Sequence, residues 1–230
     1  MSKNGYARIK RPSQSAHIQQ NGIAEYKNML KAKRPAEALK TALKWIRGKI
    51  MNFVQPIRDK NTLKKIADEL KAKNEKYYIM FMIGIYSGLR VSDILKLQVK
   101  DIQGKDHIRM REKKTGKYKS FPVNPAIRND IAAYCEGKQP TDYVVPGKPE
   151  SKPVSREYAH RVIHEAGKRY GLDDLGTHSM RKTFGYHYYT QTKDIATLMK
   201  IFNHSSESIT LRYIGIEQQS IDEAIMNFSY

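Results

Sequence analysis

Residues 77–93 read Tyr-Tyr-Ile-Met-Phe-Met-Ile-Gly-Ile-Tyr-Ser-Gly-Leu-Arg-Val-Ser-Asp. The first ten of them are apolar on every side of a helix, and an all-round apolar helix of this length belongs at the centre of a protein core. Ser87-Gly88 then stops the helix, because glycine readily takes the backbone conformations that end one. Arg90 follows directly, at a place where the fold holds a side chain still. The stretch therefore predicts a helical fold built around a buried central helix.

Helical patterns lie on both sides of this central helix. Apolar residues recur at helical spacing in six further stretches: 61–73, 126–134, 155–170, 179–190, 195–202 and 220–227. The helical period disappears around 99–102, 107–110 and 118–123, and the last two runs flank residues 113–117 as the strands of a hairpin flank their turn. The sequence therefore predicts a mainly α fold with one small antiparallel β-sheet (α+β).

Composition limits the class of protein and of partner. The chain has 230 residues, of which 40% are hydrophobic, enough for one ordinary domain or two small ones. Its 42 Lys and Arg outnumber its 23 Asp and Glu, and the net charge of +19 indicates a polyanionic partner, nucleic acid or an acidic membrane surface. Without an 18-residue apolar run or an N-terminal signal-peptide core, we expect a cytoplasmic protein that does not enter a membrane. A single cysteine, Cys135, excludes an internal disulfide and a cysteine-based zinc site.

The positive charge is concentrated near the N-terminus. Residues 1–50 contain 12 Lys and Arg and two Glu, a net +10. We expect residues 1–52 to form a basic, helical DNA-binding arm in which Lys40, Lys44 and Arg47 face phosphate, and residues 53–230 to form a separate domain. A solvated tail would have the same composition.

Three strings hold the residues that can perform chemistry. They are Ser87-Gly88-Leu89-Arg90-Val91-Ser92-Asp93, His178-Ser179-Met180-Arg181, and Asn203-His204-Ser205-Ser206, with Tyr213 nine residues after His204. Together they resemble the tyrosine recombinase (phage integrase) family, whose catalytic domain carries Arg, Lys, His-x-x-Arg, His or Trp, and a nucleophilic Tyr in this order. The resemblance covers roughly residues 53–230, and the ordered set is far more specific than any one string. It implies the tyrosine recombinase catalytic-domain fold, double-stranded DNA as the substrate, and no need for ATP, a metal or another cofactor.

The chemistry of strand cleavage explains these residue types. A pentavalent transition state builds negative charge on the non-bridging phosphate oxygens, and the planar guanidinium groups of Arg90 and Arg181 can bind two such oxygens and stay charged. Tyr213 would attack phosphorus and hold the DNA as a phosphotyrosyl ester, which conserves the bond energy for rejoining. A phenol with a pKa of about 10 is a poor nucleophile at neutral pH, so a base is needed, and His178 is the candidate. We expect His204 to donate a hydrogen bond to a phosphate oxygen.

The resemblance also implies supporting roles. In the family a lysine on a β-hairpin protonates the departing 5′-oxygen, and Lys114 matches it because it stands eight residues before Pro122. Lys113 and Lys117 are then phosphate contacts or solvated charges of the hairpin. Asp93 matches the acidic position that orients the first arginine of the set, although an aspartate at a helix start needs no such role.

One histidine pair has two interpretations. His160 and His164 lie four residues apart on a predicted helix, and this spacing could bind zinc. No third ligand of the right type follows at a recognisable interval. Two helix-surface histidines over DNA or solvent are the simpler interpretation, so we predict no metal site.

The C-terminal helix carries an apolar stripe made of Ile221, Ala224, Ile225 and Phe228. In the family such segments pack on a neighbouring protomer, which implies a homotetramer assembled on DNA through this helix. Docking of the stripe on its own domain is the alternative.

The chain departs from the family pattern in three places. The segment before the catalytic domain is shorter than the usual DNA-clamping domain, so either residues 1–52 are a reduced version or the protein needs an accessory DNA-binding protein. Lys182 follows Arg181 where histidine is frequent, and Phe202-Asn203 replaces a frequent Leu-Gly before His204. We expect neither substitution to touch the catalytic set.

Three functions compete. The leading hypothesis is a site-specific DNA recombinase that acts through a 3′-phosphotyrosyl intermediate and a Holliday junction, for integration, excision or resolution of a mobile element, phage or plasmid. A DNA-binding regulator that keeps the fold without cutting is the alternative, but the retention of all candidate catalytic positions argues against it. Relaxation of supercoils, as type IB topoisomerases perform it, shares the chemistry and would lack dependence on a DNA site.

Overall fold

The computed structural model describes residues 54–111, 118–217, 220 and 226–227. The chain divides into two units, Met1–Phe53 and Val54–Tyr230, and the fold described here is that of the second unit. In this described part, every helix is too short or too polar to span a lipid bilayer. Several predicted features lie outside the described residues: the arm with Lys40, Lys44 and Arg47, the hairpin turn with Lys113, Lys114 and Lys117, and the apolar stripe Ile221, Ala224, Ile225 and Phe228.

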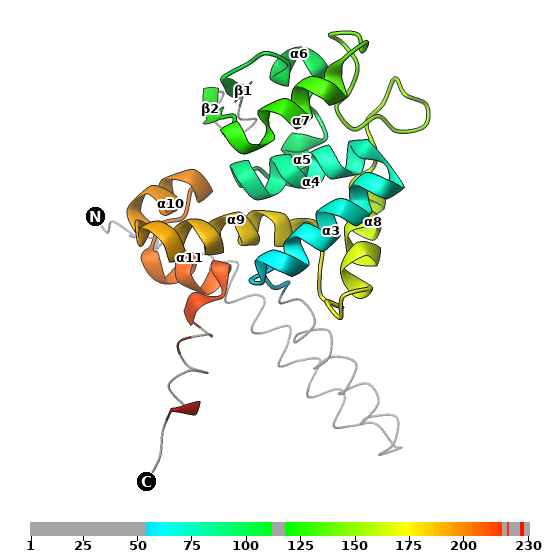
Figure 1. The fold of residues 1–230 in the computed structure, drawn as a ribbon. Coiled ribbons are helices and arrows are strands. Elements are labelled where there is room, and N and C mark those ends of the chain that lie inside the picture. Colours follow the sequence, from blue (N-terminus) through cyan, green and yellow to red (C-terminus); the bar gives the residue numbers. More distant parts are fainter. Residues whose placement is uncertain (1–53, 112–117, 218–219, 221–225, 228–230) are drawn as a thin grey trace, which may run out of the picture. The chain divides into compact units, whose positions relative to one another are not determined.

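The described elements are, in chain order, α3 (Lys60–Lys73), α4 (Glu75–Ser87), α5 (Val91–Ile94), α6 (Val99–Ile102), β1 (His107–Arg111), β2 (Tyr118–Pro122), α7 (Pro125–Cys135), α8 (Arg156–Lys168), α9 (Thr177–Thr192), α10 (Ile195–Phe202) and α11 (Glu207–Ile214). Figure 1 shows a mainly helical domain with one small sheet, which confirms the predicted fold class. The sheet is antiparallel, and Ile108 of β1 pairs with Phe121 of β2.

Helix α4 is the buried centre of the domain, as its all-round apolar sequence predicts. It packs against α3, α7 and α9, and residues such as Met80, Phe81 and Ile83 are completely buried. Its N-terminus is capped by Asn74, whose side chain accepts a hydrogen bond from the Lys76 backbone N–H at 3.1 Å. The helix ends at Gly88, which has a φ of +64°.

The apolar residues form two clusters. The larger one surrounds α4 and includes Met180 of α9. The smaller one joins α10 and α11 to the second half of α9, with Leu198, Phe202 and Ile214 fully buried. Helix α9 therefore contributes to both clusters, and Figure 1 shows it running from α8 to the pair formed by α10 and α11.

Helices α6 and α11 differ from the sequence-based prediction. Residues 99–102 were expected to be non-helical, but they form α6, because the Asp101 carboxylate accepts a hydrogen bond from the Gln98 N–H at 2.9 Å and caps the turn. Helix α11 was not predicted. The Ser206 hydroxyl caps it by accepting a hydrogen bond from the Ile209 N–H at 3.3 Å, and Gly215 ends it with a φ of +78°.

Candidate active site

The turn after α4 places Arg90. Two features of Gly88 favour glycine. A Cβ atom there would lie 2.5 Å from Cδ1 of Phe184, and the backbone is in the left-handed region. Two residues later Arg90 is the N-cap residue of α5, with its side chain exposed. Arg90 lines a hollow of about 590 Å³ together with His160, Thr177 and His178. The turn thus directs the first candidate arginine into the same hollow as the candidate base.

One face of α9 carries the centre of the site. His178, Arg181, Lys182 and Gly185 follow the i, i+3, i+4, i+7 spacing that brings residues to one side of a helix. At Gly185 a Cβ atom would lie 2.7 Å from atoms of both Phe202 and Ile214. This glycine therefore permits α10 and α11 to approach the helix closely, directly beside the candidate catalytic residues.

Arg181 is 4% exposed and joins three elements. Its guanidinium donates hydrogen bonds to the Gly88 carbonyl oxygen after α4 and, at 3.1 Å, to the Phe202 carbonyl oxygen at the end of α10. Its charge also lowers the pKa of the Tyr213 side chain on α11, and its Cζ lies 4.2 Å from the Phe202 ring centroid. Burial lowers the pKa of Arg181 to about 10, so the group remains charged at neutral pH.

The turn after α10 and the last turn of α11 place the His204 and Tyr213 rings edge to face. Asn203 ends α10 with a φ of +56°, a left-handed conformation that asparagine tolerates better than most residues. The His204 and Tyr213 rings then lie 5.1 Å apart at 77°, and His204 Nδ1 lies 3.1 Å from the Thr210 hydroxyl oxygen. Both rings also contact Phe202, at centroid distances of 5.4 and 5.3 Å.

The electrostatics of the site favour neutral histidines and a neutral tyrosine before DNA arrives. Burial lowers the pKa of His178, and the charges of Lys182, Arg181 and Arg90 lower it further. Burial likewise lowers the pKa of His204. Burial raises the pKa of Tyr213, against the opposing effect of the Arg181 and Arg90 charges. A neutral His178 can accept a proton, and Tyr213 retains one to give.

The structure thus brings five of the six predicted catalytic residues into one electrostatically connected site; the sixth, Lys114, lies outside the described residues. Asp93 lies in the first turn of α5, where its charge raises the pKa of Arg181. Its predicted action on Arg90 stays a prediction.

Two residues that the sequence analysis set apart from the catalytic set belong beside it. Phe202 packs under Arg181, as described above, and the Lys182 ammonium lies 5.1 Å from the Tyr213 ring centroid. These departures from the family pattern replace no member of the catalytic set, but their side chains contact it. The sequence does indicate that Lys182, four residues after His178, lies on the same side of one helix as the candidate base.

His160 and His164 stack with ring centroids 6.1 Å apart, and His164 Nδ1 lies 3.2 Å from the Leu175 carbonyl oxygen. Within the described residues, no three His, Cys, Asp or Glu side chains come close enough together to hold one metal ion. His160 instead faces the hollow that contains Arg90 and His178.

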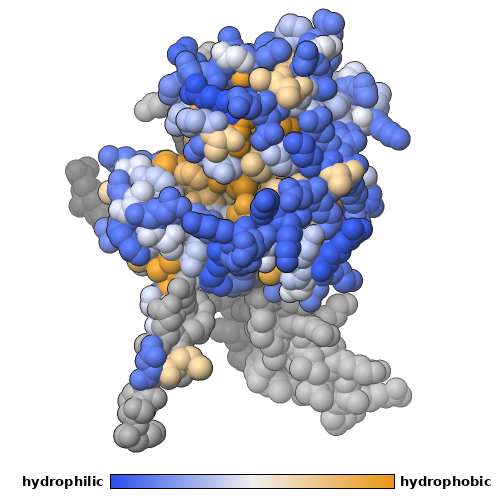
Figure 2. Space-filling view, viewed as in Figure 1, coloured by the Kyte–Doolittle hydropathy of each residue, from blue (hydrophilic) through white to orange (hydrophobic). Residues whose placement is uncertain are grey.

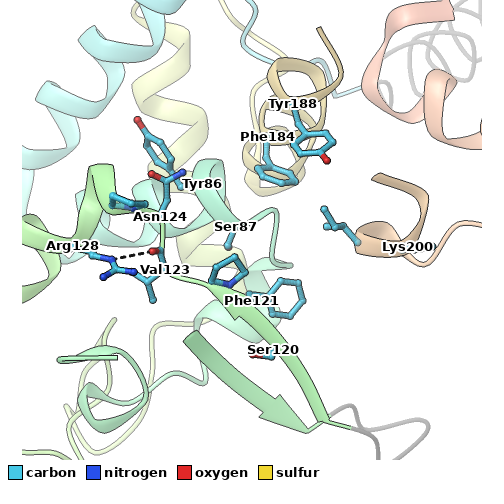
Figure 3. Close-up of a pocket in the computed structure, with 13 residues that line it drawn as sticks. Tyr86, Ser87, Ser120, Phe121, Val123, Asn124, Arg128, Phe184, Tyr188 and Lys200 are labelled. Atoms are coloured by element: carbon cyan, nitrogen blue, oxygen red, sulfur yellow. Dashed lines mark hydrogen bonds between the residues drawn. The ribbon is translucent and has the colours of Figure 1, made fainter. Parts of the chain in front are cut away.

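A second concavity, an apolar groove of about 630 Å³, lies between β2 and α9. Figure 2 shows its apolar residues gathered in a hollow on one face of the domain. In Figure 3, Phe184 and Tyr188 of α9 and Lys200 of α10 face Phe121 and Ser120 of β2 across the groove. None of the predicted catalytic residues that the structure describes lines it, so we place the chemistry in the site around Arg181.

Solved structures share this fold. The crystal structure of XerA recombinase superposes with a TM-score of 0.59 at 18% identity, covering 76% of this chain and 65% of that one. XerH site-specific recombinase bound to palindromic difH substrate also gives a TM-score of 0.59, at 16% identity, covering 76% of this chain and 53% of that one. At these identities the likeness establishes the fold.

Sequence relatives carry the comparison further. The probable integrase/recombinase YoeC of Bacillus subtilis is 44% identical over 178 residues, which are 77% of this chain and 98% of the relative. Tyrosine recombinase XerC of Staphylococcus epidermidis is 26% identical over 166 residues, and the match spans about half of that protein, 55% of its length. The model of the phage integrase family matches residues 58–220. With most of its length matched in this way, the chain belongs to the phage integrase family.

Proposed function

We propose that the protein is a site-specific DNA recombinase that cleaves and rejoins DNA strands through Tyr213. The observation that carries this proposal is the position of Arg181. A buried guanidinium held by two backbone carbonyls, whose charge lowers the pKa of the Tyr213 hydroxyl, is placed for the phosphate group that the tyrosine would attack.

In the proposed cleavage step, the Tyr213 hydroxyl oxygen forms a bond to phosphorus while the bond from phosphorus to the 5′-oxygen breaks. His178 takes the proton that Tyr213 releases, because its lowered pKa keeps it neutral. Arg90, Arg181 and His204 bind the non-bridging oxygens as negative charge grows on them. The product is a 3′-phosphotyrosyl ester, and the same step in reverse joins the strand to a new 5′-hydroxyl.

The departing 5′-oxygen must gain a proton, and we propose Lys114 as its donor. This residue lies between β1 and β2, the two strands whose pairing the structure describes. Lys113 and Lys117 are proposed as phosphate contacts in the same turn.

The assembly is also part of the proposal. Strand exchange needs two duplexes, and we propose a homotetramer on double-stranded DNA, joined through the C-terminal stripe of residues 221–228. The basic residues 1–52, with Lys40, Lys44 and Arg47, would contact the duplex. An accessory DNA-binding protein would add contacts to DNA where this arm alone binds too weakly. A chromosomal or plasmid substrate places the reaction in the cytoplasm.

Covalent trapping tests the function. The protein is incubated with nicked DNA fragments from the region around its own gene, denatured, and examined for a protein–DNA adduct. We expect an adduct that Tyr213→Phe abolishes and Tyr189→Phe retains, since Tyr189 is a tyrosine of α9 in the same small apolar cluster. An adduct that survives Tyr213→Phe would contradict the assignment of the nucleophile. Salt-sensitive binding by the wild type without any adduct would favour the non-cleaving regulator.

A further inference from the structure

Lys182 is a lysine in an unusual place. Its side chain is 7% exposed, whereas lysines are almost never fully buried because their ammonium group is strongly hydrated. It lies on α9 immediately after Arg181 and one helical turn after His178. Its Nζ is 5.1 Å from the centroid of the Tyr213 ring, within the range of a cation–π interaction. A buried cation therefore lies over the ring of the proposed nucleophile.

We infer that Lys182 is a positioning residue for Tyr213, holding the ring of the nucleophile and favouring the phenolate as it forms. This inference rests on the proposed function. The ammonium acts through the ring over which it lies. The Arg181 charge lowers the pKa of the hydroxyl of the same side chain. The two neighbouring cations of α9 would therefore act on both the ring and the oxygen of Tyr213.

The reaction gives this contact its effect. As Tyr213 passes its proton to His178 and bonds to phosphorus, negative charge appears on the phenolate and then moves to the phosphate. A cation attracts a phenolate more strongly than a neutral phenol, because the charge adds to the attraction of the ring quadrupole. An interaction that strengthens as the transition state forms raises the rate, whereas one equal in both states does not.

Lys182 also acts on the base. Its charge is the second cause, after burial, of the lowered pKa of His178. The charged and titratable groups that act on His178 are Lys182 and Arg181 on α9, Arg90 after α4, and His160 on α8. Removing the Lys182 charge alone should raise the pKa of His178, so that the base is lost to protonation at a higher pH. Burial lowers the pKa of Lys182 itself, and we take the ammonium as the active form.

The test compares adduct formation by three variants across pH, with nicked DNA in a single turnover. Lys182→Met keeps the length of the side chain and removes its charge, and we expect the plateau rate to fall about tenfold, with the acid limb displaced to higher pH. Lys182→Arg keeps a cation and should retain the wild-type pH profile. Lys182→His should lose rate as the pH rises and the imidazole deprotonates.

Each outcome decides the inference separately from the function. A wild type that forms no Tyr213-dependent adduct would remove the proposed function itself. A wild type that does form one, together with a Lys182→Met variant of unchanged rate and profile, would overturn the role of Lys182. Equal losses in Lys182→Met and Lys182→Arg with an unmoved acid limb would indicate structure alone. If circular dichroism shows that Lys182→Met does not fold, Lys182→His is used instead. A rate of adduct formation that does not decline in this variant as the pH rises would also overturn the role of Lys182.

Discussion

Gly88→Ala perturbs the turn that places Arg90, and the structure supplies a matched control. Gly88 and Gly104 both have a φ of +64°. A Cβ atom on Gly88 would lie 2.5 Å from Phe184 Cδ1 and 2.9 Å from Cε1, whereas a Cβ atom on Gly104 meets nothing within 4 Å. The two substitutions therefore share the same backbone strain, and only Gly88→Ala adds a steric clash.

The two costs can be assigned magnitudes. Holding an L-residue in the left-handed region costs roughly 1–2 kcal/mol at either position. Forcing a methyl group against a ring adds about 1–3 kcal/mol. Phe184 packs against Phe202 and Tyr188 at centroid distances of 6.2 and 5.8 Å, so a ring that moved into the groove would lose these contacts. We expect Gly104→Ala to lower the free energy of unfolding by about 1–2 kcal/mol and Gly88→Ala by about 2–5 kcal/mol.

Urea unfolding of the three proteins measures this difference, and adduct formation measures its effect on the site. Because the Gly88 carbonyl accepts a hydrogen bond from Arg181, we expect Gly88→Ala to slow adduct formation by at least about tenfold under conditions where it is fully folded. Gly104→Ala should react as the wild type does. If the free energies of unfolding of the two variants lie within about 0.5 kcal/mol of each other, Phe184 moves aside without cost, and the reasoning from close packing is refuted.

Three further outcomes are expected. Arg181→Lys leaves the carbonyl of Gly88 or of Phe202 without its donor, and should lower the free energy of unfolding by about 1–3 kcal/mol in urea titrations; unchanged stability would contradict the bridging role. Since the pKa of His178 is lowered in the folded protein, the unfolded chain binds more protons below about pH 6.5, so stability should fall as the pH drops through the folded pKa. His178→Asn should make the free energy of unfolding depend less on pH. If the stability of this variant falls as steeply as that of the wild type, another group is responsible. DNA binding, followed by fluorescence anisotropy, should weaken roughly 1,000-fold between about 50 and 200 mM salt if the net charge of +19 acts through phosphate contacts; a salt-insensitive affinity would disprove that.

The sequence could predict most of the fold because most elements obey the ordinary helical period. The prediction of residues 195–202 matches α10, and the centrally buried α4 follows from an apolar run without a polar face. Helix α11 breaks the rule on which such prediction depends. Its Ile209 is 45% exposed while Thr210 is fully buried, hydrogen-bonded to the Ser206 carbonyl oxygen and beside His204. The inward residue is polar and the outward one apolar, so no periodic stripe marks the helix that carries Tyr213.

The candidate site could be predicted residue by residue but not as an arrangement. The order of Arg90, His178, Arg181 and Tyr213 along the chain suffices to select them from many residues of the same types. The order does not say what lies between them in space. The contact of Lys182 with Tyr213 depends on how α11 docks on α9, and that docking depends on close packing at a glycine. Such a contact follows only from the folded arrangement.

The division of the apolar core explains why Arg181 has two tasks. Met180, its neighbour on α9, lies in the larger cluster around α4, whereas Phe202 and Tyr213 belong to the smaller cluster of α10 and α11. Arg181 hydrogen-bonds the Gly88 carbonyl on the first side and the Phe202 carbonyl on the second. The guanidinium proposed to bind the scissile phosphate thus also joins the part of the domain that holds Arg90 to the part that holds the nucleophile. A loss of activity in any Arg181 variant therefore combines lost transition-state charge with a displaced tyrosine. Only comparison with the measured free energy of unfolding separates the two.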